Sequence, residues 1–199
     1  MNTLSKGLLV INGSLRQGGN TDVVTRFVMK GAEKTGIPCK EVKLRELSIK
    51  DCDGCYQCIK TGACLIADDM QSVYKSLEKA NILVFATPNY FCGVTGIMKV
   101  FLDRLFVYFH KSAKHRIEGK TAILLVTMNQ KDEPKETKLL YNTFKVVFKH
   151  IGILLQEAYY FSEIMEKEAV ILKPDYLKMA ENIGYSLTSQ CEKTDASAN

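Results

Sequence analysis

The sequence predicts an α/β domain built on an open parallel β-sheet with helices on both faces. Short apolar runs alternate along the chain with longer amphipathic stretches. Several of the runs are apolar on every residue, as strands are when both faces of a parallel sheet are buried. Strands that alternate with helices also favour right-handed crossovers, which place helices on both sides of the sheet.

Composition limits the class of protein. The chain has 199 residues, of which 46% are hydrophobic and 25% charged, as is typical of one soluble globular domain. The formal net charge of +5 is spread along the chain, so we expect no nucleic-acid partner. No apolar run approaches the roughly 20 residues of a membrane span, and the N-terminus does not resemble a signal peptide. We therefore expect a cytoplasmic protein without a membrane partner.

Five strands and five helices are predicted in alternation. A buried strand over 8–12 precedes a loop and a helix over 21–34, which Asn20 or Thr21 can cap. The next strand covers 39–44, and residues 45–67 lack clear periodicity. The later elements are expected in this order: helix 68–79, strand 82–86, helix 94–109, strand 121–126, helix 135–150, strand 153–160 and helix 174–189. We expect one domain over 1–190 and a disordered tail over 191–199.

The loop after the first strand has the composition of a phosphate site. Residues 13–21 read Gly-Ser-Leu-Arg-Gln-Gly-Gly-Asn-Thr and lead directly into a predicted helix. A helix N-terminus binds anions through unpaired N–H groups and the macrodipole, and glycines let the backbone approach closely. The loop matches neither a Walker A loop nor the G-x-G-x-x-G pattern. The alternative to a phosphate site is a plain βα turn with a capped helix. The predicted phosphate-binding residues are Ser14, Arg16, Gly19, Asn20 and Thr21.

A second unusual loop, over 87–96, comes after the third strand. If the strand order is 2-1-3-4-5, this loop and the first one flank the topological switch point, where flavodoxin-like folds hold FMN. Tyr90 and Phe91 offer flat apolar surface for an aromatic ring, although they can also simply cap the end of the sheet. The loop over 127–130 reaches the same edge and is either part of the site or a generic polar loop. The further predicted cofactor residues are Pro88, Asn89, Tyr90, Phe91, Cys92, Gly93, Thr127 and Asn129.

Together the two motifs resemble the NADPH-dependent FMN reductase superfamily. The resemblance covers about residues 5–185 and is carried by Gly13-Ser14-x-Arg16-x-x-Gly19-Asn20-Thr21, Pro88-Asn89-Tyr90, Gly93, Gly96, Lys99 and Asp103-Arg104. It implies a flavodoxin-like three-layer sandwich with the FMN phosphate at the first loop and the flavin ring along 88–93. It also implies a homodimer or homotetramer through the helix that carries Lys99 and Asp103. Asn89 departs from the pattern, because relatives often have an apolar residue there.

Four of the seven cysteines form a C-x2-C-x2-C-x5-C array within 51–66, an insertion after the second strand. In a reducing cytosol such thiols are better interpreted as ligands or packed thiols than as disulfides. No histidine is near, which disfavours zinc, and successive C-x2-C steps are typical of iron–sulfur binding. The array resembles the iron–sulfur flavoprotein branch of the superfamily. That resemblance implies a [4Fe–4S] cluster on Cys52, Cys55, Cys58 and Cys64.

The expected function is electron transfer carried by FMN, in which no side chain needs to act as a nucleophile. With a cluster, we expect one-electron exchange with a ferredoxin-like or small-molecule redox partner. Without a cluster, an NAD(P)H-dependent FMN or quinone reductase is the better interpretation. A third possibility is a non-enzymatic FMN carrier or thiol redox sensor, in which the cysteine loop is a switch. Cys39 and Cys191 are expected to be structural or incidental.

Overall fold

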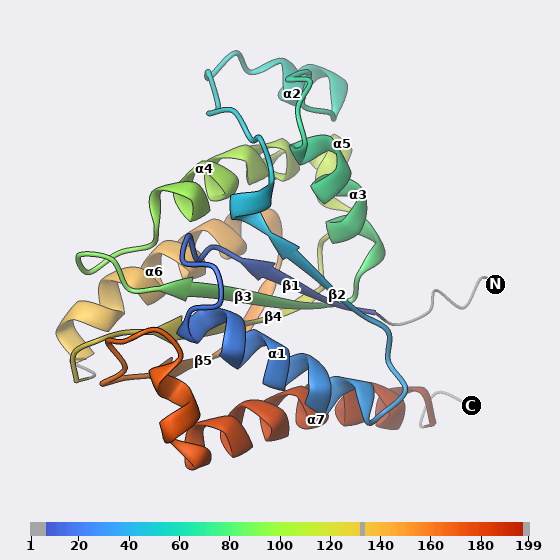
Figure 1. Ribbon diagram of the computed structural model, residues 1–199. Coiled ribbons are helices and arrows are strands. Elements are labelled where there is room, and N and C mark those ends of the chain that lie inside the picture. Colours follow the sequence, from blue (N-terminus) through green and yellow to red (C-terminus); the bar gives the residue numbers. More distant parts are fainter. Residues whose placement is uncertain (1–6, 132–133, 197–199) are drawn as a thin grey trace.

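Five parallel strands form one sheet in the order β2-β1-β3-β4-β5 in the computed structural model (Figure 1). The predicted flavodoxin-like sandwich and its strand order are confirmed. The strands are β1 (Leu8–Asn12), β2 (Cys39–Lys43), β3 (Ile82–Pro88), β4 (Thr121–Thr127) and β5 (Leu154–Phe161). The structure describes residues 7–131 and 134–196. Within these ranges, residues 134, 136 and 189–196 are described by their backbone alone.

Helices cover both faces of the sheet (Figure 1). On one face, α1 (Asn20–Glu33) and α7 (Pro174–Ala196) pack against each other, and on the other lie α3 (Met70–Lys79), α4 (Gly96–Arg104) and α6 (Pro134–Ile151). The short elements are η1 (Leu44–Glu46), α2 (Gln57–Thr61), η2 (Leu105–Phe109), α5 (Lys111–Lys114) and η3 (Ala169–Leu172). No helix in the described ranges is long and apolar enough to cross a membrane.

The central strands are buried because both of their faces are covered. In β1, Leu8 and Val10 belong to the core beneath α1 and α7. Leu9 and Ile11 belong to the core beneath α3, α4 and α6. Alternate side chains point to opposite faces of a strand, so a strand between two helical layers must be apolar throughout. This requirement is why the apolar runs in the sequence predict these strands well.

The predicted helix over 94–109 is two elements in the structure. The α-helical part ends at Arg104, and residues Leu105–Phe109 continue as a 3₁₀ turn. Leu105, Val107 and Tyr108 are all buried. These three positions do not share one face of an α-helix, and the tighter 3₁₀ turn lets all of them reach the core.

The structure also corrects the predicted ends of the first and last helices. The N-cap of α1 is Gly19, without a side-chain cap, so neither Asn20 nor Thr21 caps it as expected. The last helix continues to Ala196 rather than ending near residue 189. The segment predicted as a tail is therefore helical from 191 to 196, and residues 197–199 lie outside the described part of the chain.

Candidate functional site

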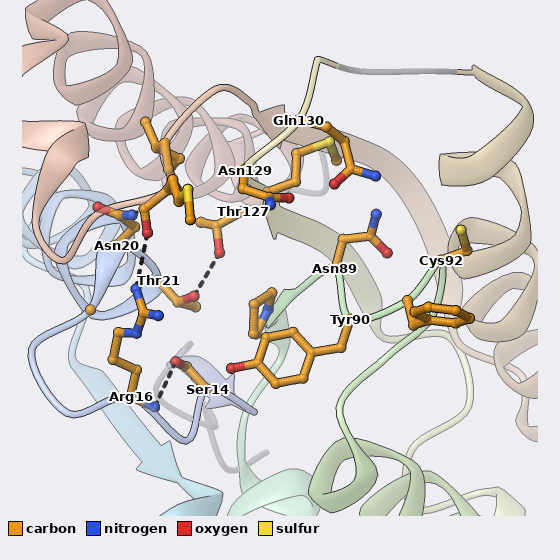
Figure 2. A pocket seen from close by; sticks show the side chains of 16 residues that line it. Ser14, Arg16, Asn20, Thr21, Asn89, Tyr90, Cys92, Thr127, Asn129 and Gln130 are labelled. Carbon is orange, nitrogen blue, oxygen red and sulfur yellow. Dashed lines mark hydrogen bonds between the residues drawn. The ribbon is translucent and has the colours of Figure 1, made fainter.

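A pocket of about 680 Å³ lies at the carboxyl edge of the sheet, between the loops that come after β1 and β3 (Figure 2). This volume is within the range of small-molecule and cofactor sites, about 300–1,000 Å³. Its position is the topological switch point, because β1 and β3 are neighbours whose helices leave toward opposite faces. The lining residues are Ser14, Arg16, Gly19, Asn20, Thr21, Pro88, Asn89, Tyr90, Phe91, Cys92, Thr127, Met128, Asn129, Gln130, Ile164 and Met165.

Thus the pocket brings together every sequence-predicted cofactor residue except Gly93. Met128 and Gln130 also line the pocket and belong to the loop over 127–130, which the sequence had already offered as part of the site. Two lining residues, Ile164 and Met165, were missed. Ile164 and Met165 come after β5, in a loop that carries no glycine and no recognisable motif in the sequence.

The loop after β1 is held in a fixed shape by its own polar groups. The Asn12 side-chain oxygen accepts a hydrogen bond from the Ser14 backbone N–H at 2.9 Å, and Ser14 Oγ accepts one from the Arg16 N–H at 3.3 Å. Gly13 packs closely on α4, because a Cβ there would lie 2.7 Å from the Met98 methyl carbon and 3.0 Å from the Met98 Cβ. The loop is therefore pressed against α4, with Ser14 at the floor of the pocket.

Asn20 connects this loop to the segment after β5. Its amide nitrogen donates to the backbone oxygens of Ile164, at 3.0 Å, and Glu166, at 2.8 Å, while its oxygen accepts from the Val170 N–H at 3.0 Å. The Asn20 side chain thus builds the wall of the pocket. Arg16 reinforces the same connection, since its guanidinium donates to the Met165 backbone oxygen at 3.0 Å (Figure 2).

The third loop is joined to the other two at its first residue. Thr127 Oγ1 lies 2.8 Å from Thr21 Oγ1, and the Thr127 backbone oxygen accepts the Asn89 N–H at 2.8 Å. Both threonines are buried. Thr127 therefore connects the three predicted loops, and Figure 2 shows its hydrogen bond to Thr21.

The loop after β3 is a tight turn that displays two aromatic rings. Tyr90 and Gly93 exchange both backbone hydrogen bonds, and between them Phe91 and Cys92 have positive φ angles of 49° and 63°. Left-handed backbone in non-glycine residues costs about 1–3 kcal/mol each and is concentrated at functional sites. Tyr90 is 48% exposed and Phe91 fully exposed, so both rings stand at the mouth of the pocket.

Asn89 supplies a test of whether the pocket fits a flavin. Its side-chain oxygen is buried and has no hydrogen-bond partner within the described chain. Such a group normally costs about 1–3 kcal/mol unless something donates to it. A flavin ring carries an N–H donor as well as carbonyl acceptors, and the surrounding walls combine aromatic, thioether and amide side chains. The residues present therefore fit FMN.

The four cysteines of the array line a second recess, of about 300 Å³. The loop that carries them lies above α4 in Figure 1. All four thiols are free, Cys52 and Cys55 being exposed and Cys58 and Cys64 partly buried. Burial raises the pKa of the Cys58 thiol, and the negative charges of the other three thiolates raise it further. Four thiols on one short loop are the donor set of an iron–sulfur cluster, so the residues present fit such a cluster by their chemistry.

The structure describes no preformed site for a metal ion at this recess. Among the residues that the structure describes, no group of three or more His, Cys, Asp or Glu side chains could hold one. The backbone has the sharp turns that a short wrapping loop needs, with positive φ at Gly54, Tyr56 and Gly62.

A buried arginine anchors the cysteine loop at both ends. Arg104, at the end of α4, pairs with Asp68 at 2.5 Å, donates to the Lys50 backbone oxygen at 2.8 Å and lies 3.5 Å from Cys64 Sγ. Burial alone would raise the pKa of Asp68, but the Arg104 hydrogen bond and the Lys50 N–H outweigh it and hold that pKa below its usual range. The loop is therefore fixed to the same helix that begins beside the pocket.

Sequence comparison agrees with this geometry. The profile of the NADPH-dependent FMN reductase family matches residues 7–161. The chain belongs to this family. The matched range contains the pocket loops after β1, β3 and β4 and the whole cysteine array.

Several proteins similar to this chain carry the name of a flavoprotein or an oxidoreductase. An iron-sulfur flavoprotein of Archaeoglobus fulgidus is 30% identical over 126 residues, which are 63% of this chain and 56% of that protein. The chain spans about half the length of the first curated relatives it matches. The Trp repressor binding protein of Bacillus subtilis is 25% identical, with a TM-score of 0.65, covering 88% of this chain and 99% of that one. An NAD(P)H:quinone oxidoreductase from Methanothermobacter marburgensis, 15% identical, shares the fold with a TM-score of 0.73 over 92% of this chain and 99% of that one.

Proposed function

We propose that the chain is an FMN-dependent oxidoreductase. The observation that carries the proposal is the pocket at the switch point, which is lined by both predicted motifs and by the unpaired Asn89 oxygen. When bound, FMN supplies a ring that accepts a hydride or single electrons.

The residues of the chain bind and orient that ring. Ser14, Arg16 and the N-terminus of α1 offer hydroxyl, guanidinium and backbone donors for a phosphate. The Asn89 amide oxygen offers an acceptor for the ring, and Tyr90 and Phe91 offer apolar surface at the mouth. Because Tyr90 and Phe91 are exposed at the mouth, a small-molecule or ferredoxin-like redox partner can approach the pocket there.

We further propose that Cys52, Cys55, Cys58 and Cys64 hold a [4Fe–4S] cluster, which would exchange single electrons. Support comes from the shared recess, from the four free thiols on one short loop, and from the iron-sulfur flavoproteins among the relatives. Free thiols in all six described cysteines are consistent with a reducing, cytoplasmic location.

The experiment is to measure iron, acid-labile sulfide and flavin per chain on protein purified without oxygen. We expect about four irons, about four sulfides and about one FMN. The Cys58→Ser variant should lose its iron and keep its FMN. The matched control is Cys39→Ser, which removes a thiol outside the array and should keep both.

Each other outcome changes the assignment. Full iron content in Cys58→Ser contradicts the ligand set. FMN without iron in the wild-type protein contradicts the cluster and favours the NAD(P)H-dependent FMN or quinone reductase, which steady-state NAD(P)H oxidation then tests. Protein that cannot be loaded with FMN contradicts the proposed function itself.

A further inference from the structure

An ion pair lies beneath the loop after β1, outside the pocket lining. Arg45, in η1, donates to both carboxylate oxygens of Asp22, from Nη1 at 2.9 Å and from Nη2 at 2.8 Å. Asp22 is in the first turn of α1. The two side chains are only 9% and 14% exposed. This is a bidentate, largely desolvated pair, unlike a surface salt bridge.

The pair holds both ends of the loop. Arg45 Nη1 donates to the Ser14 backbone oxygen at 3.1 Å, and Asp22 Oδ2 accepts the Gly18 N–H at 2.8 Å. Gly18 has a φ of 65°, which only glycine adopts freely and which fits the carboxylate contact. The ion pair thus holds the loop at Ser14 and at Gly18, in addition to the hydrogen bonds within the loop itself.

Charge gives the pair a second effect. A carboxylate in the first turn of α1 occupies the positive end of the helix dipole that a bound phosphate also needs. Arg45 balances this charge in surroundings that are otherwise acidic. Glu41 Oε1 accepts from Asn12, which also donates to Asp22, and Glu46 lies 3.8 Å from Arg45 Nη2. A second cation, Lys43, lies 3.7 Å from Glu41.

We propose that Arg45 is a positioning residue for the phosphate of the bound flavin, acting through Asp22. It fixes the loop that receives the phosphate and cancels the carboxylate charge beneath it. The Arg45–Asp22 pair therefore determines the preference for the phosphorylated flavin, FMN, over riboflavin, although neither side chain lines the pocket. The inference rests on the proposed binding of FMN.

The test compares two ligands that differ only in the phosphate. Apo protein is titrated with FMN and with riboflavin, and binding is followed by quenching of flavin fluorescence. We expect Arg45→Gln to weaken FMN binding about tenfold, roughly the effect of one charge-assisted contact, and to change riboflavin binding less than about twofold. Adding Asp22→Asn to Arg45→Gln should recover part of the loss for FMN, because it removes the uncompensated charge.

The matched control is Lys34→Gln, which removes one positive charge from the C-terminal end of α1, where Lys34 pairs with Glu181. It should leave both affinities unchanged. If Arg45→Gln does not fold, Arg45→Lys keeps the charge but loses the bidentate contact, and we expect it to lower FMN affinity several-fold with riboflavin unaffected.

Three results would overturn the inference. Equal losses for FMN and riboflavin would make Arg45 merely structural. If Lys34→Gln lost as much FMN affinity as Arg45→Gln, the loss would come from the change in net charge and not from the position of Arg45. Unchanged FMN affinity in the Arg45 variants would remove the positioning role while leaving the proposed function intact. Failure of the wild-type protein to bind FMN would instead refute the proposed function, and the inference with it.

Discussion

The Cys39 thiol, at the start of β2, differs from the thiols of the array in its surroundings. It is partly buried and lies 3.4 Å from the Ile37 backbone oxygen, to which it donates. Burial raises the pKa of Cys39 to about 11, and the negative charge of Glu33 contributes. The expectation that Cys39 is structural remains a prediction, and the shifted pKa makes it testable.

We predict that iodoacetamide modifies Cys39 far more slowly than Cys52 and Cys55 in iron-free, reduced protein at pH 8. Only about 0.1% of a thiol with a pKa of 11 is thiolate at that pH, whereas Cys52 and Cys55 are exposed. The Cys39 rate should rise as pH increases toward 11. Peptide mass spectrometry over time gives the rates, and protein unfolded in urea, in which Cys39 reacts as an ordinary thiol, is the control. Equal rates in the folded protein at pH 8 would contradict the assigned surroundings.

Single residues also show how far the sequence predicts the site. Ser14 and Arg16 were predicted because phosphate sites need such donors at a helix N-terminus. The role of Asn20 in holding the segment after β5 was not predicted, since its partners lie 144 to 150 residues away. Arg45 was missed for a similar reason, because its partners, Asp22 and Ser14, come from a different loop and helix earlier in the chain.

At the scale of elements, α1 is positioned by direct backbone contact with α7. A Cβ on Gly31 would overlap the Glu181 backbone, and a Cβ on Gly184 would overlap the Val28 backbone. Glycine is therefore required at both positions for the two helices to approach so closely. Because α1 begins at the phosphate loop, this contact also fixes the helix N-terminus that faces the pocket.

We expect Gly184→Ala to lower the free energy of unfolding by about 2 kcal/mol or more, because overpacking outweighs the gain in helix propensity of about 1 kcal/mol. The matched control is Gly96→Ala, in α4, where a Cβ would meet nothing. It should stay within about 0.5 kcal/mol of the wild-type protein. Urea denaturation measures both, and a neutral Gly184→Ala would show that the helices can move apart without cost.

The elements that the sequence predicts best are the strands whose two faces are both buried. β1, β3 and β4 are apolar over most of their length because they are covered on both faces. The break between α4 and η2 was not predicted, because 94–109 is apolar on more than one side and periodicity cannot show where a helix tightens. The shape of the cysteine loop was not predictable either, since Arg104 fixes it from a distant helix.

On the scale of the whole molecule, the pocket draws its walls from segments spread between Ser14 and Met165. These segments come together only when the entire sheet is formed. A ligand in the pocket therefore binds the folded chain and not the unfolded one, so its binding free energy adds to the stability of the whole domain.

We predict that FMN at about 100 times its dissociation constant stabilises the protein by about 2.7 kcal/mol. For a domain of this size, that corresponds to a rise in Tm of about 5–11 °C. Differential scanning fluorimetry or calorimetry measures the shift, and riboflavin at the same concentration, lacking the phosphate, should give a smaller one. Bound FMN without any rise in Tm would contradict a pocket built by the whole fold.

The helix α4 has a consequence for how this chain can evolve. Its nine residues begin beside the pocket, where its N-cap Thr95 donates to the Gly13 backbone oxygen, and end at Arg104 beneath the cysteine recess. Each residue inserted into or deleted from a helix shifts the downstream part of that helix by about 1.5 Å and turns it by about 100°. A change of length within α4 would therefore displace the recess and swing Arg104 away from Cys64. Natural insertions and deletions should accordingly be rare within this helix.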